Sequence, residues 1–273
     1  MMSNFIHLQT KSHYSISCGL PKTTEIVDKA VESGMPAVTL ADKNTFFGLV
    51  KFYNYALIKG IKPICGVDFD IKVNNGYSNL ILLAKNKKGL EKLFKLSTES
   101  FVKSGSEKRS IPEQDILNNA DDIVCIIPSS SPNLRNLALK KEDLLIDQHY
   151  KKYLEAFAEN LFVGVSNFSK DGYDSASALA CNIAKKNNIK AVAINDVLFL
   201  EKEDHLAHQA KVAINNATLL KDEIDNPNVS SEQYFKTEEE LAKFHELEPL
   251  KNTFEVAKPV SYTHLRAHET TCD

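Results

Sequence analysis

The chain alternates short, continuously apolar runs with segments of helical periodicity, and no other feature constrains its fold as much. Runs of this length and composition are typical of strands that are buried on both faces. Two of the helical segments are followed by Gly34 and Gly60, the residue type favoured just beyond a helix end. The predicted strands are residues 5–8, 37–40, 61–69, 79–84, 123–127, 161–165 and 191–194, and the predicted helices are residues 23–33, 46–59, 90–100, 131–158, 173–187 and 204–215.

This order of elements predicts an α/β fold. Strands buried on both faces, each followed by a helix, favour parallel strands with helices on the outside. The pattern therefore predicts a seven-stranded relative of the β/α barrel, with a doubly wound open sheet as the alternative. In both folds the functional site lies at the carboxyl ends of the strands.

Composition excludes several classes of protein. The 273 residues are 43% hydrophobic, which is ample for a core, and the formal net charge of −3 differs from that of a basic nucleic-acid-coating domain. The N-terminus lacks the pattern of a signal peptide and no apolar run approaches the roughly 20 residues of a membrane helix, so we expect a cytoplasmic protein without a membrane partner. The five cysteines form no CxxC pair, so neither a zinc ribbon nor a disulfide framework is predicted.

Polar side chains follow the apolar runs, where a barrel would place its site. The stretch after the first run, QTKSHYS, is the densest of these clusters. It is either a metal site, the remains of one, or an ordinary loop. The polar residues at the predicted strand ends are Gln9, Lys11, Asp42, Lys43, Asp68, Ser129, Asn167 and Asp196.

Several longer motifs resemble one known family in matching order and spacing. They are FIHLQTKSHYSISCGL, GMPAVTLADKNTFFGLVKFYNYALIKGIKPICGVDF, LILLAKNKKGLEKLFKLS, AVAINDVLFLEKEDHLAH and YFKTEEELAKFHELEPLKNTFEVAK. Together they are similar to the N-terminal domain of the α subunits of bacterial DNA polymerase III, a member of the polymerase-and-histidinol-phosphatase (PHP) superfamily. The resemblance covers residues 5–258 and implies a distorted seven-stranded β/α barrel.

Active members of this superfamily bind a cluster of divalent metals through histidines and carboxylates at the strand ends. The resemblance places these ligand positions on Gln9, Lys11, Cys18, Asp42, Lys43, Asp68, Asp196 and Leu198. Only the three aspartates match the family's ligands. The family also often carries a histidine near Asn79.

Two of the replacements introduce cations. A lysine ammonium has no lone pair and repels a metal. We therefore expect a vestigial rim that binds no metal and contains no catalytic residue, with Lys11 or Lys43 paired to Asp42, Asp68 or Asp196. His7 is expected in a buried strand and His13 lies outside the ligand spacing, so neither replaces a lost ligand.

Two other features are expected to be structural. The lysines between residues 85 and 109 could contact phosphate, but interspersed glutamates favour a solvated helix and loop. His205 and His208 have helical spacing without a nearby third ligand, so they are expected at a helix start rather than in a metal site.

The resemblance also implies a division of the chain and its partners. Residues 1–215 would form the barrel, residues 216–258 closing helices and a linker, and residues 259–273 a tail that resembles translated cloning sequence, so that His264 and His268 are not ligands. The polymerase palm, which uses magnesium, would lie beyond this chain, so this fragment needs no cofactor and is expected to be inactive by itself.

The partners implied are the rest of the polymerase subunit, a proofreading exonuclease subunit and the replicative holoenzyme, with DNA reached only through the parent protein. Two alternatives remain open, an active metal-dependent phosphoesterase that acts as a pyrophosphatase or proofreader, and a free-standing interaction module. We also expect that Asp68→Ala or Asp196→Ala would destabilise the barrel without loss of an activity.

Overall fold

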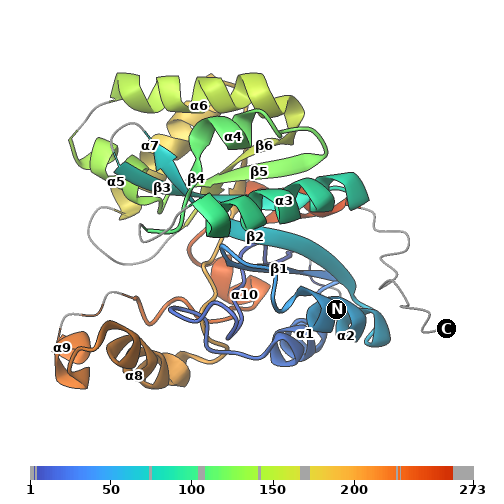
Figure 1. The fold of residues 1–273 in the computed structure, drawn as a ribbon, viewed down its shortest axis with the longest axis vertical. Helices are drawn as coiled ribbons and strands as arrows, with labels where there is room; N and C mark the ends of the chain where they lie inside the picture. The colour runs from blue at the N-terminus through green and yellow to red at the C-terminus, as the bar shows by residue number, and fades with distance from the viewer. Residues whose placement is uncertain are drawn as a thin grey trace.

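A computed structural model describes residues 3–260, except residues 4, 74–75, 104–107, 141–142, 167–172, 226 and 228. Its sheet is built from seven strands: β1 (Ala37–Lys43), β2 (Lys62–Val73), β3 (Gly76–Ala84), β4 (Ile111–Pro112), β5 (Ile123–Pro128), β6 (Leu161–Val165) and β7 (Lys190–Ala193). The main path runs β1-β2-β3-β5-β6-β7, and β4 pairs with β2 beside it. Figure 1 shows a mixed α/β fold with a curled sheet.

The expectation of an all-parallel sheet is wrong for one strand. β1 pairs with β2 in parallel, as do β5 with β6 and β6 with β7, but β3 runs antiparallel to both β2 and β5. Only two residues separate β2 from β3, and a connection that short forces an antiparallel pair. β3 lies in the middle of the sheet, so both of its faces are buried, as they are in a parallel strand.

The prediction of a strand at residues 5–8 is also wrong, because this segment forms no strand. The seventh strand of the sheet is instead the two-residue β4, which was not predicted. The residues that follow the 5–8 segment nevertheless connect the two sheet edges. The amide of Ala41 in β1 donates to the Thr10 carbonyl over 2.9 Å, and the Lys11 amide donates to the carbonyl of Val197, beyond β7, over 3.0 Å. The N-terminal segment therefore closes the curl between β1 and the chain after β7.

The helices that periodicity predicts lie close to their predicted ranges, whereas α4 was not predicted. Residues 131–158 divide into two helices. Gly34 (φ 67°) and Gly60 (φ 73°) each lie two residues beyond the end of α1 and α2, in a backbone conformation that favours glycine. The helices are α1 (Thr23–Glu32), α2 (Leu49–Ile58), α3 (Lys87–Lys103), α4 (Glu113–Leu117), α5 (Pro132–Leu139), α6 (Asp143–Phe157), α7 (Tyr173–Lys186), α8 (His205–Asn216), α9 (Leu220–Asp225), α10 (Glu238–Leu241) and α11 (Leu247–Ala257), with 3-10 turns at Ala158–Asn160 and Lys202–Asp204.

Two apolar layers hold this fold together. The larger layer lies between the sheet and the helices around it, whereas the smaller one joins side chains on the inner face of the curled sheet. Ile6 and Leu8 from the N-terminal segment belong to the inner layer, as do Val256 and Ala257 of α11. The Ile6 amide donates to Thr253 Oγ1 of α11 over 3.1 Å, so this helix fastens the N-terminal segment from inside.

Helices α8 and α9 lie as a pair away from the sheet, at the lower left of Figure 1. Two side chains of α8 connect the pair to the loop after the N-terminal segment: His208 Nε2 lies 2.6 Å from the Cys18 carbonyl oxygen, and Lys211 Nζ donates to the Gly19 carbonyl. None of the helices within the described ranges is both long and apolar enough to cross a bilayer.

Candidate functional site

The structure brings the predicted rim residues together at one end of the sheet. Asp42 and Lys43 end β1, and Lys43 is in register with Asp68 of β2. Lys11 reaches the same place from the N-terminal segment, and Asp196 reaches it from the chain just after β7. Because these elements meet at the closure of the curl, residues far apart in the sequence form one cluster.

Lys11 is the central cation of this cluster. Its ammonium lies 3.0 Å from Asp68 Oδ2 and forms a second ion pair with Asp196, and its side chain is buried. Burial alone would lower the pKa of Lys11, but the carboxylates of Asp196 and Asp68 raise it above its ordinary value. Lys11 is therefore a permanently charged group that the fold has desolvated and compensated.

Asp68 is the central anion. Lys43 Nζ lies 3.0 Å from its Oδ1, opposite the contact that Lys11 makes with Oδ2. Gln9 Nε2 donates to Oδ2 over 3.1 Å, and Asn79 Nδ2 donates to Oδ1 over 3.0 Å. Burial would raise the pKa of Asp68, but Lys11 and Lys43 hold it below its ordinary value. Both carboxylate oxygens are thus occupied by donors from the protein itself.

Lys43 also contacts a residue that the sequence reasoning did not include. Its Nζ lies 3.1 Å from Asp70 Oδ1, and exposed Lys108 approaches the same oxygen at 3.6 Å. Burial would lower the pKa of Lys43, but Asp68 and Asp70 raise it. The predicted ion pairing is therefore confirmed for Lys11 with Asp68 and Asp196 and for Lys43 with Asp68, and Asp70 extends the network.

Asp42 has different partners from those expected. Ser12 donates to it through its amide over 2.7 Å and through its hydroxyl over 2.8 Å, and Ser15 Oγ donates over 2.6 Å. Burial raises the pKa of Asp42, although the hydrogen bonds from Ser15 and Ser12 oppose that effect. This aspartate anchors the loop after the N-terminal segment instead of pairing with a lysine, so Asp68 and Asp196 are the ones of the three expected alternatives that pair.

The remaining predicted positions surround a cavity of about 330 Å³. Cys18 lies half-buried at its wall, with a thiol pKa that burial raises, and Leu198 is buried. Gln233, far along the chain, reaches Asp196 Oδ2 at 3.4 Å. Sequence reasoning missed Gln233 because no motif marks it. It also missed Asp70, although Asp70 follows Asp68 by two residues in a strand and so faces the same side.

The remaining histidines and polar residues lie away from the rim cluster. His7 is buried between the rings of Phe5 and Phe235, and its Nε2 lies 2.8 Å from the Lys236 carbonyl oxygen. His205 and His208 contact backbone carbonyls, and His205 begins α8. Buried Ser129 hydrogen-bonds other serines instead of reaching the rim cluster. Asn167 and the tail histidines 264 and 268 lie outside the described residues.

A cluster of divalent metals does not fit the residues of this rim. Metal ligation needs neutral imidazoles, carboxylates or thiolates with free lone pairs. Here two ammonium groups lie between the carboxylates, and Lys11, Lys43, Gln9 and Asn79 already occupy both oxygens of Asp68. In the described part of the chain, no three His, Cys, Asp or Glu side chains are grouped as metal ligands.

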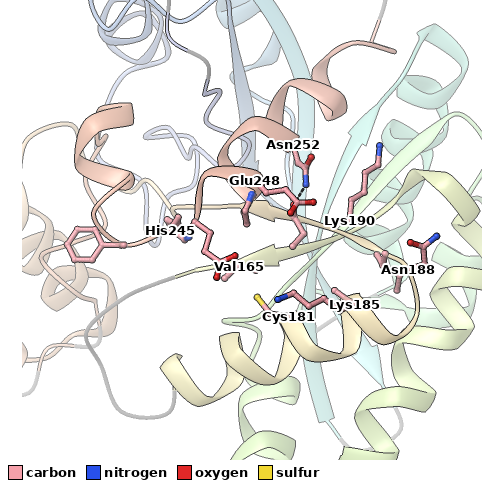
Figure 2. A pocket seen from close by; sticks show the side chains of 14 residues that line it. Val165, Cys181, Lys185, Asn188, Lys190, His245, Glu248 and Asn252 are labelled. Atoms are coloured by element: carbon pink, nitrogen blue, oxygen red, sulfur yellow. Dashed lines mark hydrogen bonds between the residues drawn. The ribbon is translucent and has the colours of Figure 1, made fainter.

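A larger cavity, of about 430 Å³, lies elsewhere and contains none of the predicted rim residues. It lies between α7, the start of β7 and the beginning of α11 (Figure 2). Lysines and glutamates both line it, and Asn252 Nδ2 donates to the Ala191 carbonyl over 2.8 Å at its edge. His245 lies in its wall, where burial lowers the pKa of the imidazole to about 4. Because its charged side chains have both signs and do not point to one class of ligand, we assign no function to this cavity.

Known proteins similar to this chain include bacterial replication proteins. The chain is 31% identical over 265 residues to the DNA polymerase III subunit alpha of Escherichia coli K12, and 31% identical over 264 residues to that of Pseudomonas aeruginosa. These matches cover 95% and 94% of the chain but only 23% and 22% of the relatives. The chain therefore spans less than a quarter of the length of the curated relatives that it matches.

Solved structures give a weaker likeness. An amidohydrolase from Chromobacterium violaceum superposes with a TM-score of 0.49 at 13% identity, covering 71% of this chain and 87% of the other. That likeness is too low to support an argument. The model of the PHP domain, in contrast, matches residues 7–167, more than half of the sequence. The chain therefore belongs to the PHP-domain family.

Proposed function

We propose that this chain is the PHP domain of a bacterial DNA polymerase III α subunit, located in the cytoplasm, and that it serves the polymerase as an architectural domain without a chemistry of its own. The similarity to α subunits over almost the whole chain supports the parentage. The main support for a domain without catalytic activity is the double ion pair of Asp68 with Lys11 and Lys43.

The ion pairs favour an architectural role for a physical reason. Each lysine ammonium fills the space and neutralises the charge for which a metal would otherwise be required. The cluster joins the N-terminal segment, β1, β2 and the chain after β7, so it supports the closure of the sheet. A metal-dependent phosphoesterase would need these same positions for ligands.

Metal binding provides the first test. Purified protein incubated with zinc or manganese and then desalted should retain far less than one metal per chain. It should also show no phosphatase activity that chelation abolishes. The measurement is elemental analysis together with hydrolysis of a chromogenic phosphate ester.

A variant that replaces both rim lysines, Lys11→His with Lys43→His, is the matched comparison. Because it removes two cations and adds two ligands, it should bind more metal than the natural sequence. Stoichiometric metal in the unmodified protein, together with activity that is lost on chelation, would establish the phosphoesterase and exclude a domain without catalytic activity.

The proposed partners follow from the parentage. The domain would pack against the rest of the α subunit and would dock the proofreading exonuclease subunit of the same organism, within the holoenzyme. Co-expression with that exonuclease should give a complex that survives size-exclusion chromatography. Independent migration of the two proteins at micromolar concentrations would contradict the docking role.

The gene itself tests the parentage. The reading frame of the natural gene should continue beyond Lys258 into a palm domain with paired aspartates. A stop codon directly after Lys258 in an intact gene would instead favour a free-standing interaction module.

A further inference from the structure

A strip of aromatic and cationic side chains, all exposed except the half-buried Tyr14, lies beside the rim, where the chain leaves β1 and enters α2. We define the strip as Tyr14, Phe47, Lys51, Phe101 and Arg109. Phe47 is 64% exposed and Phe101, in the last turn of α3, is 37% exposed. Soluble domains rarely leave neighbouring aromatic rings in water without a use for them.

Contacts between rings and cations run along the strip. The ring centroids of Phe47 and Phe101 lie 5.9 Å apart. The guanidinium carbon of Arg109 lies 3.6 Å from the Phe101 centroid, the separation of a stacked pair. Lys51 Nζ lies 5.8 Å from the centroid of the Tyr14 ring. The strip therefore holds two neighbouring rings with a cation stacked on one of them, and a second pair of one ring and one cation.

The layer beneath holds these rings in place. Phe46 and Phe94 meet edge to face, with centroids 4.9 Å apart, and they join the loop after β1 to α3. Ser97 Oγ donates to the Asn44 carbonyl over 3.2 Å in the same contact. Because both sides are fixed to each other, ordering the exposed rings on binding would cost little conformational entropy.

Within the part of the chain that the structure describes, two cations of the strip have no carboxylate partner of the kind that their neighbours have. Lys103 pairs with Glu99 and Asp115, and Lys108 approaches Asp70. Among the residues that the structure describes, neither Lys51 nor Arg109 forms an ion pair, and both are exposed. An anionic partner would therefore gain attraction here without breaking an ion pair to any of the described residues.

We propose that this strip binds single-stranded DNA. A nucleobase can stack on Phe47 or on the outer face of the Arg109 guanidinium, while the phosphates that join successive bases contact Lys51 and Arg109. Aromatic rings set beside cations match the bases and phosphates of a nucleic-acid chain, and stacking platforms combined with positive charge are how proteins bind single strands without sequence preference. Duplex DNA hides its base faces and offers no such match.

The choice of DNA over RNA rests on the proposed function, whereas the stacking surface itself does not. The surface is also distinct from the lysine-rich face of α3, whose cations alternate with glutamates. A membrane would need several apolar side chains free to enter lipid, but Arg109 already covers one face of the Phe101 ring.

Fluorescence anisotropy with a labelled oligo-dT of 12 nucleotides tests the proposal directly on this chain. At low salt, the natural sequence should bind it with a Kd in the micromolar range. Phe47→Ala with Phe101→Ala should weaken binding at least tenfold, since stacking contributes strongly for each base. Lys51→Gln with Arg109→Gln should reduce the slope of log K against log salt by about 1.4, from roughly 0.7 for each cation on a single strand.

Matched controls lie on the same two helices. Ile58→Ala removes an apolar side chain that is 79% exposed at the far end of α2, and Lys88→Gln removes an exposed cation at the start of α3. Both should bind oligo-dT like the natural sequence, and thermal melting should show that all four variants are folded. Equal losses in the controls would show that binding does not depend on the strip and would overturn the proposal.

Three further results would also overturn it: absence of binding at low salt, binding that is unchanged in the Phe47 and Phe101 variant, or capture by anionic vesicles instead of oligo-dT. Tenfold tighter binding of oligo-U would assign the strip to RNA and reject DNA as its partner. None of these outcomes depends on the metal content of the rim or on the reading frame beyond Lys258, so this proposal and the proposed function can fail separately.

Discussion

Replacing Asp68 with alanine should lower the free energy of unfolding by about 3–5 kcal/mol, because the substitution leaves two ammonium groups beside each other in a buried site. Lys11 would retain Asp196 and Lys43 would retain Asp70, so the protein should still fold at low temperature. For a chain of this size, the loss corresponds to a fall in Tm of roughly 6–20 °C. Circular dichroism melting and urea titration measure it.

Two comparisons separate this effect from ordinary surface electrostatics. Asp121→Ala removes a carboxylate that is 93% exposed and 3.6 Å from Lys92, and should cost less than about 1 kcal/mol. Asp196→Ala should cost less than Asp68→Ala, since its side chain is partly exposed and Lys11 keeps Asp68. Adding Lys11→Met to Asp68→Ala should restore part of the lost stability. An Asp68→Ala protein that melts like the natural sequence would contradict the structural role of the cluster.

Stability should also fall steeply as pH decreases from about 6.5 toward 4. Burial lowers the pKa of His7 and of His149 to about 4 in the folded protein, whereas an unfolded histidine titrates near 6.5. In this window the unfolded chain binds protons that the folded chain does not, so acid favours unfolding. Stability from these groups is fully present above pH 6.5 and is lost as pH falls. His7 alone should account for about 3 kcal/mol between the two limits.

Urea unfolding at pH 7, 6 and 5 measures this dependence. His7→Gln should reduce the slope of the unfolding free energy against pH by up to about 1.4 kcal/mol per pH unit near pH 5, the value for one proton. The lowered pKa of Asp68 changes stability only below about pH 4, where an unfolded aspartate begins to bind its proton. It therefore does not affect the slope between pH 5 and pH 7. An identical slope in the variant and the natural sequence would show that His7 is not buried as a neutral group.

Much of the fold follows from local sequence. Residues 161–165 form β6 as predicted, because a continuous apolar run bounded by polar residues has few other buried conformations. The direction of β3 did not follow, since a strand in the middle of a sheet is covered on both faces whichever way it runs. The run at residues 5–8 is apolar for another reason: Ile6 and Leu8 fill the inside of the curl.

The rim shows the same division between local and long-range information. The resemblance to a family identified the positions of Lys11, Lys43 and Asp68, and elementary charge chemistry predicted that they pair. Charge chemistry left open which of the three aspartates would pair, and it did not indicate that Ser12 and Ser15 would bind Asp42, because hydroxyl groups carry no charge. Gln233 could not be found from sequence, since only the folded chain brings it to Asp196.

The closure of the curl also orders events during synthesis. Thr10 bridges to Val197, and Lys11 pairs with a carboxylate 185 residues further along the chain. Contacts so distant in sequence are slow to form, and loop entropy is lost before they stabilise anything. A ribosome must therefore release almost 200 residues before the first dozen can settle into their final place. Until then, Ile6 and Leu8 remain uncovered, and the nascent chain depends on its helices and the β2–β3 hairpin for early structure.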